Sequence, residues 1–118
     1  MIDRPWAEEF AKDWRASWHA RDLDALLSHY SPNVVFRSPL ISKVLGDDKA
    51  FVTGVAELRA YWRKALDANK ELHFEINHVL IGSDAITISY RNHRGQEVAE
   101  TLVFDAQRKI TEGIVTYK

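Results

Sequence analysis

Apolar residues near the start of the chain recur at four-residue steps, which is the spacing of one face of a helix. Phe10, Trp14 and Trp18 share that face, and Asp3 can cap the first amides of the helix. A second, shorter helix is predicted from the capping residue Asp22. Its apolar positions are Leu23, Leu26, Leu27 and Tyr30.

The middle of the chain is expected to alternate between short strands and one clear helix. Residues 34–36 read as a strand that ends before Pro39, because proline cannot donate to a strand ladder. The next stretch shows no clear period apart from a short strand at 50–53. A helix follows Gly54 and is expected to stop at Asn69 in a left-handed conformation. Its buried stripe is Val55, Leu58, Trp62, Ala65 and Leu66.

The second half of the chain alternates between apolar and polar residues at period two and predicts four strands. Their ranges are 72–81, 85–92, 96–104 and 109–117. A three-residue hairpin loop with Gly95 in the left-handed conformation sets the register of the middle pair. This register puts six residues on one face of the sheet: Ile86, Ile88, Tyr90, Val98, Glu100 and Leu102. The last strand fits two registers, depending on whether its hairpin loop has four or five residues.

Three helices followed by a strand meander predict an α+β fold, with the helices on one face of an antiparallel sheet. No repeat, linker or low-complexity tract divides the chain, so residues 1–118 are expected to form one domain. The order of elements resembles the NTF2-like superfamily, in its SnoaL-like and ketosteroid-isomerase-like branch. The most specific stretches are 20–26 with Tyr30 following, 36–39 and 101–104. The resemblance implies a cystatin-like cone, with the three helices packed on the concave face of a curved sheet.

Composition limits the kinds of molecule that the protein is expected to bind. The 16 basic and 17 acidic residues leave a net charge of -1, whereas proteins that bind nucleic acids usually carry a basic excess. No apolar run approaches the ~20 residues that span a bilayer, and the N-terminus lacks the apolar core of a signal peptide. We therefore expect a soluble, cytoplasmic protein that binds neither nucleic acid nor membranes.

Thiol, metal and cofactor chemistry have no support in the sequence. The chain has no cysteine, which excludes disulfides and thiolate ligands. Its five histidines do not fall in a compact metal-binding spacing, and no glycine-rich phosphate loop is present. We expect neither a metal nor a cofactor.

Glu100 is the candidate catalytic residue. Strand alternation places it between Val98 and Leu102 on an apolar face. A carboxylate there costs free energy unless it is paired, hydrogen-bonded or protonated. One interpretation is a pocket acid with a raised pKa that donates a proton or a hydrogen bond. The other is a carboxylate at the rim that is paired with an arginine or hydrated.

The resemblance also suggests catalytic positions. Ketosteroid isomerases use a tyrosine, a protonated acid and a proton-moving aspartate. By alignment, Glu100 falls at or beside the protonated acid, Trp14 at the tyrosine and Ser38 at the aspartate. An indole lacks useful acidity, and a serine without a neighbouring base cannot abstract a carbon-bound proton. Steroid isomerisation is therefore disfavoured, and the Asp/Arg/Asp cluster of the epoxide-hydrolase members has no convincing match.

The aromatic residues support two interpretations. They either line a site for a flat hydrophobic ligand, such as a polyketide or terpenoid, or fill the core of a small domain. His78 shares strand parity with Phe74 and Leu80, so it either reaches the pocket or is a hydrogen-bonded core residue. The predicted ligand-binding residues are Trp14, Trp18, Phe36, Ser38, Trp62, His78, Ile88, Tyr90 and Leu102.

The opposite face of the sheet is predicted to be flat and weakly polar, which favours a homodimer over an ordinary solvent-facing sheet. Its residues are Val79, Ile81, Thr87, Ser89, Thr101 and Val103. The predicted function is a protein that holds a small apolar molecule in a pocket, where Glu100 catalyses isomerisation, cyclisation or hydrolysis. The alternative is a non-catalytic module for ligand binding or dimerisation, and the residues support both.

Overall fold

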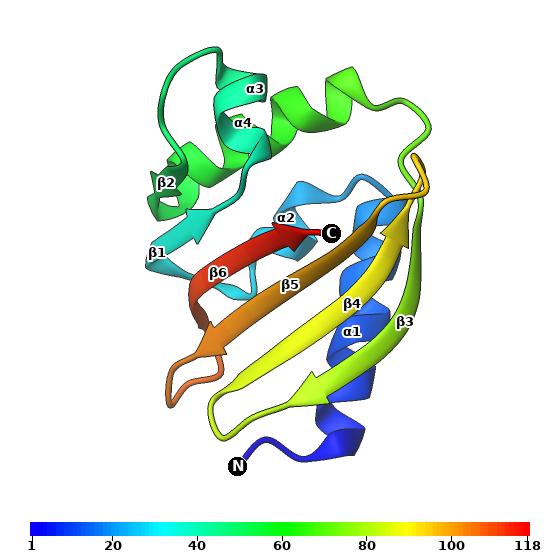
Figure 1. Cartoon of the computed structure of the whole chain (residues 1–118). Coiled ribbons are helices and arrows are strands. Elements are labelled where there is room, and N and C mark those ends of the chain that lie inside the picture. The colour runs from blue at the N-terminus through cyan, green and yellow to red at the C-terminus, as the bar shows by residue number, and fades with distance from the viewer.

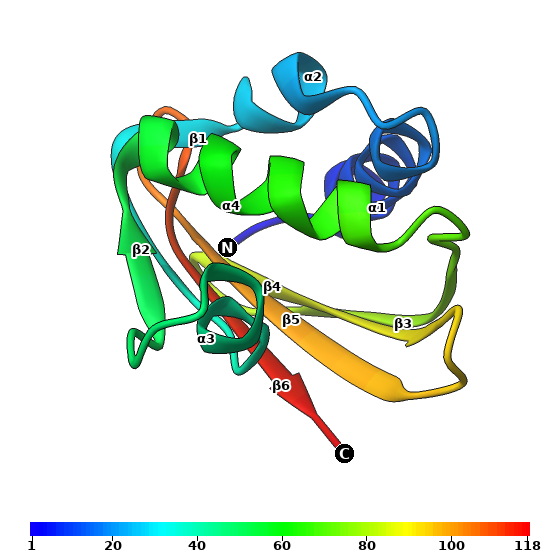
Figure 2. The same ribbon diagram turned by 90° about the horizontal axis from the view of Figure 1, so that it is seen from above.

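Segments with helical spacing and segments with period-two alternation form four helices and six strands in the computed structural model, which describes residues 1–118. The helices are α1 (Arg4–His19), α2 (Leu23–Leu27), α3 (Leu40–Leu45) and α4 (Gly54–Ala68). The strands are β1 (Tyr30–Arg37), β2 (Phe51–Thr53), β3 (Phe74–Ile81), β4 (Ala85–Asn92), β5 (Glu97–Phe104) and β6 (Ile110–Tyr117). The helices cover one side of a curved sheet, which confirms the predicted α+β class (Figures 1 and 2).

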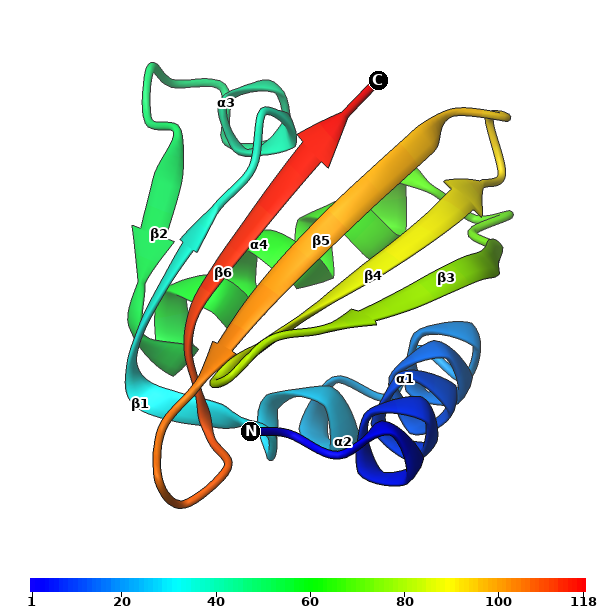
Figure 3. The ribbon, with the colours of Figure 1, turned by 60° about the horizontal axis from the view of Figure 1, so that its bottom comes forward.

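The six strands form one sheet in the order β2-β1-β6-β5-β4-β3. All neighbouring pairs are antiparallel except β1 and β6, which run parallel (Figure 3). The sheet is therefore mixed, whereas the sequence predicted an antiparallel one. The predicted register of β4 and β5 is confirmed, with Ile88 opposite Glu100 and Gly95 at φ 75°.

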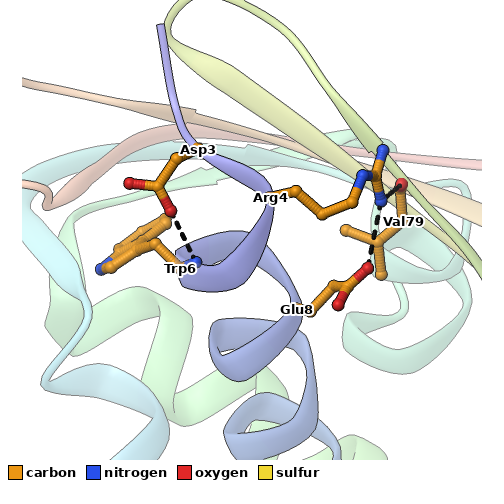
Figure 4. A network of polar contacts seen from close by, with 5 residues as sticks. All are labelled: Asp3, Arg4, Trp6, Glu8 and Val79. Carbon is orange, nitrogen blue, oxygen red and sulfur yellow. Dashed lines mark hydrogen bonds and ion pairs between the residues drawn. The ribbon is translucent and has the colours of Figure 1, made fainter.

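Hydrogen bonds made by Asp3 and Arg4 fix the first turn of α1 (Figure 4). The Asp3 carboxylate accepts a hydrogen bond from the backbone N–H of Trp6 at 2.8 Å, as a capping residue does. The Arg4 guanidinium donates to the Glu8 carboxylate and to the Val79 carbonyl, each at 3.3 Å. The second contact ties the start of α1 to β3, so the aromatic face of α1 lies against the sheet.

Three local predictions differ from the structure. Helix α3 was not predicted, because its six residues are too few to display a period. Tyr30 opens β1 instead of continuing α2. Asn69 ends α4 with φ −127° rather than in the left-handed region, and its side-chain amide instead donates to the Ala65 carbonyl at 2.7 Å.

The buried apolar side chains form one continuous cluster between the helices and the concave face of the sheet. Trp14 lies at its centre, stacked on Phe74 with ring centroids 5.4 Å apart. Trp18 meets Trp62 of α4 edge to face at 5.0 Å. Aromatic packing therefore joins α1, α4 and the sheet. None of the helices combines the length and the apolar character that crossing a membrane requires.

Candidate functional site

A cavity of about 350 Å³ lies between α4 and the concave face of the sheet. Its inner walls come from buried strand and helix residues, and its mouth is formed by exposed residues of α3, of the C-terminal end of α4 and of the β4–β5 loop. These elements gather at one end of the sheet, beside the end of β6 (Figure 3). The topology thus leaves the cone open at this end.

Glu100 reaches this cavity from the middle of β5. The residues paired with it, Ile88 of β4 and Val115 of β6, also point to the concave side, where they are buried. Only 4% of Glu100 is exposed. Its Oε1 accepts a hydrogen bond from the Tyr90 hydroxyl at 3.3 Å, and its Oε2 has no hydrogen-bond partner in the protein.

Burial makes this carboxyl group weakly acidic. Removal from water raises the pKa of Glu100 to about 7, and the hydrogen bond from Tyr90 opposes part of that rise. No cation is close enough to form an ion pair with it. The protonated and ionised forms are therefore both populated near neutral pH.

Tyrosines surround the acid and stay protonated. Burial, followed by the nearby Glu100 charge, raises the pKa of both Tyr30 and Tyr90 well above the usual value. Burial also raises the pKa of Tyr61, although the neighbouring Ser38 hydroxyl opposes the shift. These phenols offer neutral O–H groups, and that of Tyr30 has no partner in the protein.

Aromatic rings make up most of the remaining inner wall. Phe36 of β1 packs edge to face on Trp62 with centroids 5.7 Å apart. Phe74 of β3 lies 4.5 Å from the Tyr90 ring, and Trp18 closes the side toward α1. These flat surfaces would suit a flat apolar molecule.

Five of the nine predicted ligand-binding residues line the cavity, as does Glu100. They are Trp18, Phe36, Ser38, Trp62 and Tyr90. Ser38 is buried where β1 ends, and its hydroxyl accepts a hydrogen bond from the backbone N–H of Leu40 at 3.3 Å.

Three further predicted residues belong to the core behind the cavity wall. Trp14 is 1% exposed and packs against Phe74 and Tyr90, whose rings line the cavity while its own does not. Ile88 and Leu102 are fully buried and do not line the cavity. Strand parity had correctly predicted their face of the sheet, but not their depth.

His78 lies on the convex face, contrary to the prediction. A bulge between Ile76 and His78 shifts the register of β3, so that His78 pairs with Ser89. Because an extra residue reverses the alternation, every side chain beyond it changes face. His78 is exposed and lines an open groove on the far side of the sheet.

The same bulge moves two residues of the predicted dimer face to the inside. Val79 pairs with Ile88 and Ile81 pairs with Ile86, and paired residues share a face. Both are partly buried against the core. The convex face at β3 instead presents Leu80, which is 58% exposed.

A match over most of the chain decides the family. The model of the SnoaL-like domain family matches residues 11–113. This chain belongs to the SnoaL-like domain family. A SnoaL-like protein of unknown function from Burkholderia thailandensis E264 is 34% identical over 100% of this chain and 99% of its own, with a TM-score of 0.91.

Two more distant structures share the SnoaL-like fold. A putative polyketide cyclase from Sinorhizobium meliloti is 14% identical over 92% of this chain and 94% of its own, with a TM-score of 0.74. The epoxide hydrolase/cyclase-like enzyme SalBIII is 17% identical over 100% of this chain and 95% of its own, with a TM-score of 0.75. No curated protein matches the chain.

Glu100 is the only carboxylate that lines the cavity of this SnoaL-like domain. Of the two other positions that the resemblance suggested, Ser38 lines the cavity and Trp14 does not. No three His, Asp or Glu side chains converge in a way that could hold a metal ion. Glu100 is therefore the one carboxyl group that this cavity offers.

The polar residues at the mouth of the SnoaL-like cavity were not predicted from the sequence. Lys43 belongs to the unpredicted α3, and Arg94 to a loop whose side chains have no period. Lys64 follows Tyr61 by three residues on α4, so both lie on one side of the helix. That spacing was the one signal that could have placed Lys64 near the site.

Proposed function

We propose that the cavity binds a flat, largely apolar small molecule of the polyketide or terpenoid type, and that Glu100 transfers protons to and from it. The observation that carries this proposal is the carboxyl group of Glu100, which lines the cavity and whose buried Oε2 has no partner in the protein. A group with a pKa near 7 can both release and recover a proton at neutral pH.

The proposed step begins with protonated Glu100. Its O–H donates to a carbonyl or epoxide oxygen of the ligand, and transfer of the proton to that oxygen leaves Glu100 as a carboxylate. The Tyr90 hydroxyl, which donates to Oε1, stabilises the resulting carboxylate. Glu100 then takes back a proton released from a carbon or from water, which restores the acid. This sequence fits isomerisation, cyclisation or hydrolysis.

A non-catalytic binding protein is the second candidate. It is favoured by the absence of a second carboxyl group on the cavity wall, since Glu100 would then serve as both proton donor and acceptor. In this case the carboxyl group only orients the ligand through a hydrogen bond. The two candidate functions differ in whether Glu100 accelerates a reaction of the bound ligand.

A small enolisable ketone distinguishes them. 2-Tetralone is flat and apolar, and its α-protons exchange with D₂O at a rate measurable by proton NMR. We expect the protein at pH 7 to accelerate this exchange by about 10²-fold or more, and Glu100→Gln to abolish the acceleration. Glu97→Gln on the same strand is the control, because Glu97 is exposed outside the cavity.

Binding is measured separately from exchange, through quenching of tryptophan fluorescence from Trp18 and Trp62 in the cavity wall. If 2-tetralone binds but its α-protons exchange at the same rate with the wild type and with Glu100→Gln, the function is non-catalytic binding. If neither 2-tetralone nor other neutral flat probes bind, the proposal of an apolar ligand is wrong.

We also propose that the domain forms a homodimer through the convex face of the sheet. The hydroxyls of Thr87 and Thr101 bond to each other at 2.8 Å, and that of Thr116 donates to the Ala99 carbonyl at 3.1 Å. Because these hydroxyls are satisfied within the sheet, they leave no unpaired donor in the middle of the face, which suits a self-complementary contact.

Light scattering during size-exclusion chromatography tests the dimer. Thr101→Arg would place a charge in the middle of the convex face and is expected to give a monomer, whereas Ala60→Arg on the exposed side of α4 serves as the control. A wild type that elutes as a monomer at all concentrations contradicts the proposal.

A further inference from the structure

The mouth of the cavity carries unpaired positive charge. Lys43 of α3, Lys64 of α4 and Arg94 of the β4–β5 loop line it, and all three are exposed. None of them takes part in any of the ion pairs of the molecule. Arg94 donates to the neutral Asn69 side chain at 3.2 Å, so its charge is not neutralised.

This positive charge is a local property of the mouth. The chain as a whole has a net charge of -1, yet the cavity lining contains these three cations and only one acid, the buried Glu100. The three come from separate elements that the fold gathers at one end of the sheet (Figure 3). Cations that share the rim of a cleft raise the local concentration of anionic ligands.

The inner end of the cavity, in contrast to the mouth, disfavours an anionic group. It offers Glu100, the Tyr90 and Tyr61 phenols and aromatic rings, but no cation. An anionic group there would lose its hydration and face a carboxyl group without a compensating charge. The site therefore distinguishes two ends of a ligand, with a neutral oxygen inside and a negative charge at the mouth.

We infer that the ligand of this cavity is a planar aromatic or polyketide-like carboxylate, which points a neutral oxygen toward Glu100 and places its carboxylate among Lys43, Lys64 and Arg94. The inference rests on the proposed function, since it assumes that the cavity binds a flat molecule. The forked guanidinium of Arg94 suits a carboxylate especially well, because it can donate two parallel hydrogen bonds.

Two probes that share the same rings but differ in charge test this inference. 6-Hydroxy-2-naphthoate has a hydroxyl at one end and a carboxylate at the other, and its methyl ester keeps the same rings without the charge. Titrations at pH 7.5 follow the quenching of tryptophan fluorescence. At low salt we expect the acid to bind about tenfold more tightly than the ester, and this ratio should shrink as salt screens the rim cations.

Removal of the three cations should abolish the preference. In the triple variant Lys43→Gln, Lys64→Gln and Arg94→Gln, the acid and the ester should bind equally, and the ester should keep its wild-type affinity to within about twofold. The matched control carries Lys12→Gln, Lys49→Gln and Arg63→Gln. It loses the same charge at exposed positions outside the cavity lining and should retain the preference.

The possible outcomes are distinguishable. If the ester binds as tightly as the acid to the wild-type protein, the inference about charge is wrong while the proposed apolar site stands. Equal loss of preference in both triple variants also overturns it, because overall charge would then be the cause. If neither probe binds, the inference and the proposed function fail together. Should the triple variant not fold, Arg94→Gln alone, together with the salt dependence of the wild type, decides the question.

Discussion

The raised pKa of Glu100 makes the stability of this domain depend on pH. Burial brings the pKa from 4.5 to about 7 in the folded state, so the folded protein holds this proton more tightly than the unfolded chain. Stability is then highest below pH 4.5 and falls as the pH rises to about 7. At about 1.4 kcal/mol for each pKa unit, the loss amounts to about 3 kcal/mol.

Glu100→Gln removes the ionisation and keeps the shape of the side chain. Its amide oxygen can still accept the hydrogen bond from Tyr90. We expect the variant to match the wild type to within about 1 kcal/mol at pH 4.5 and to exceed it by about 3 kcal/mol at pH 8. For a chain of this length the gain corresponds to a melting temperature higher by about 10 °C.

Urea unfolding followed by tryptophan fluorescence, from pH 4.5 to pH 8.5, measures both proteins. Burial lowers the pKa of the histidines His19, His29 and His93, which affects the wild type and the variant alike and cancels in their difference. Glu97→Gln is the control: it keeps Glu100, so its stability should fall with pH as that of the wild type does. A constant difference between the wild type and Glu100→Gln at all pH values would refute the raised pKa and, with it, the proposed proton transfer.

Substitutions at three other positions probe the walls and turns of the site. Gly113→Ala should lower the free energy of unfolding by about 1–3 kcal/mol, because its Cβ would come within 2.6 Å of the Phe36 ring; an unchanged urea midpoint would mean that the ring turns aside freely. Gly95→Ala should cost about 1 kcal/mol through its φ of 75°, and Gly95→Asn, which tolerates that conformation better, should recover part of the loss in the same urea assay. Tyr90→Phe removes the hydrogen bond that lowers the pKa of Glu100. The stability of this variant should therefore level off at a higher pH than that of the wild type. An equal or lower pH contradicts the assigned bond.

Local patterns determined much of the fold and the candidate acid. Asp3 and Asp22 cap their helices as the sequence indicates, because a cap depends on residues three positions away. The short loop at Gly95 set the β4–β5 register, and that register places Glu100 on the concave face. Each of these features depends on neighbours along the chain or across one tight turn, so the sequence alone was sufficient to predict them.

Features that depend on distant segments needed the tertiary structure. The bulge that turns His78 outward belongs to the pairing of β3 with β4 and leaves no mark in the alternation of β3 itself. Trp14 lies on the expected face but does not line the cavity, because it packs against Phe74 and Tyr90, which do. The three cations lie together at the mouth only because the parallel pairing of β1 and β6 and the course of the helices bring three separate elements to one end of the sheet. Periodicity tells which side of an element is buried, whereas the packing of remote elements decides what lies against that side and where a cavity remains.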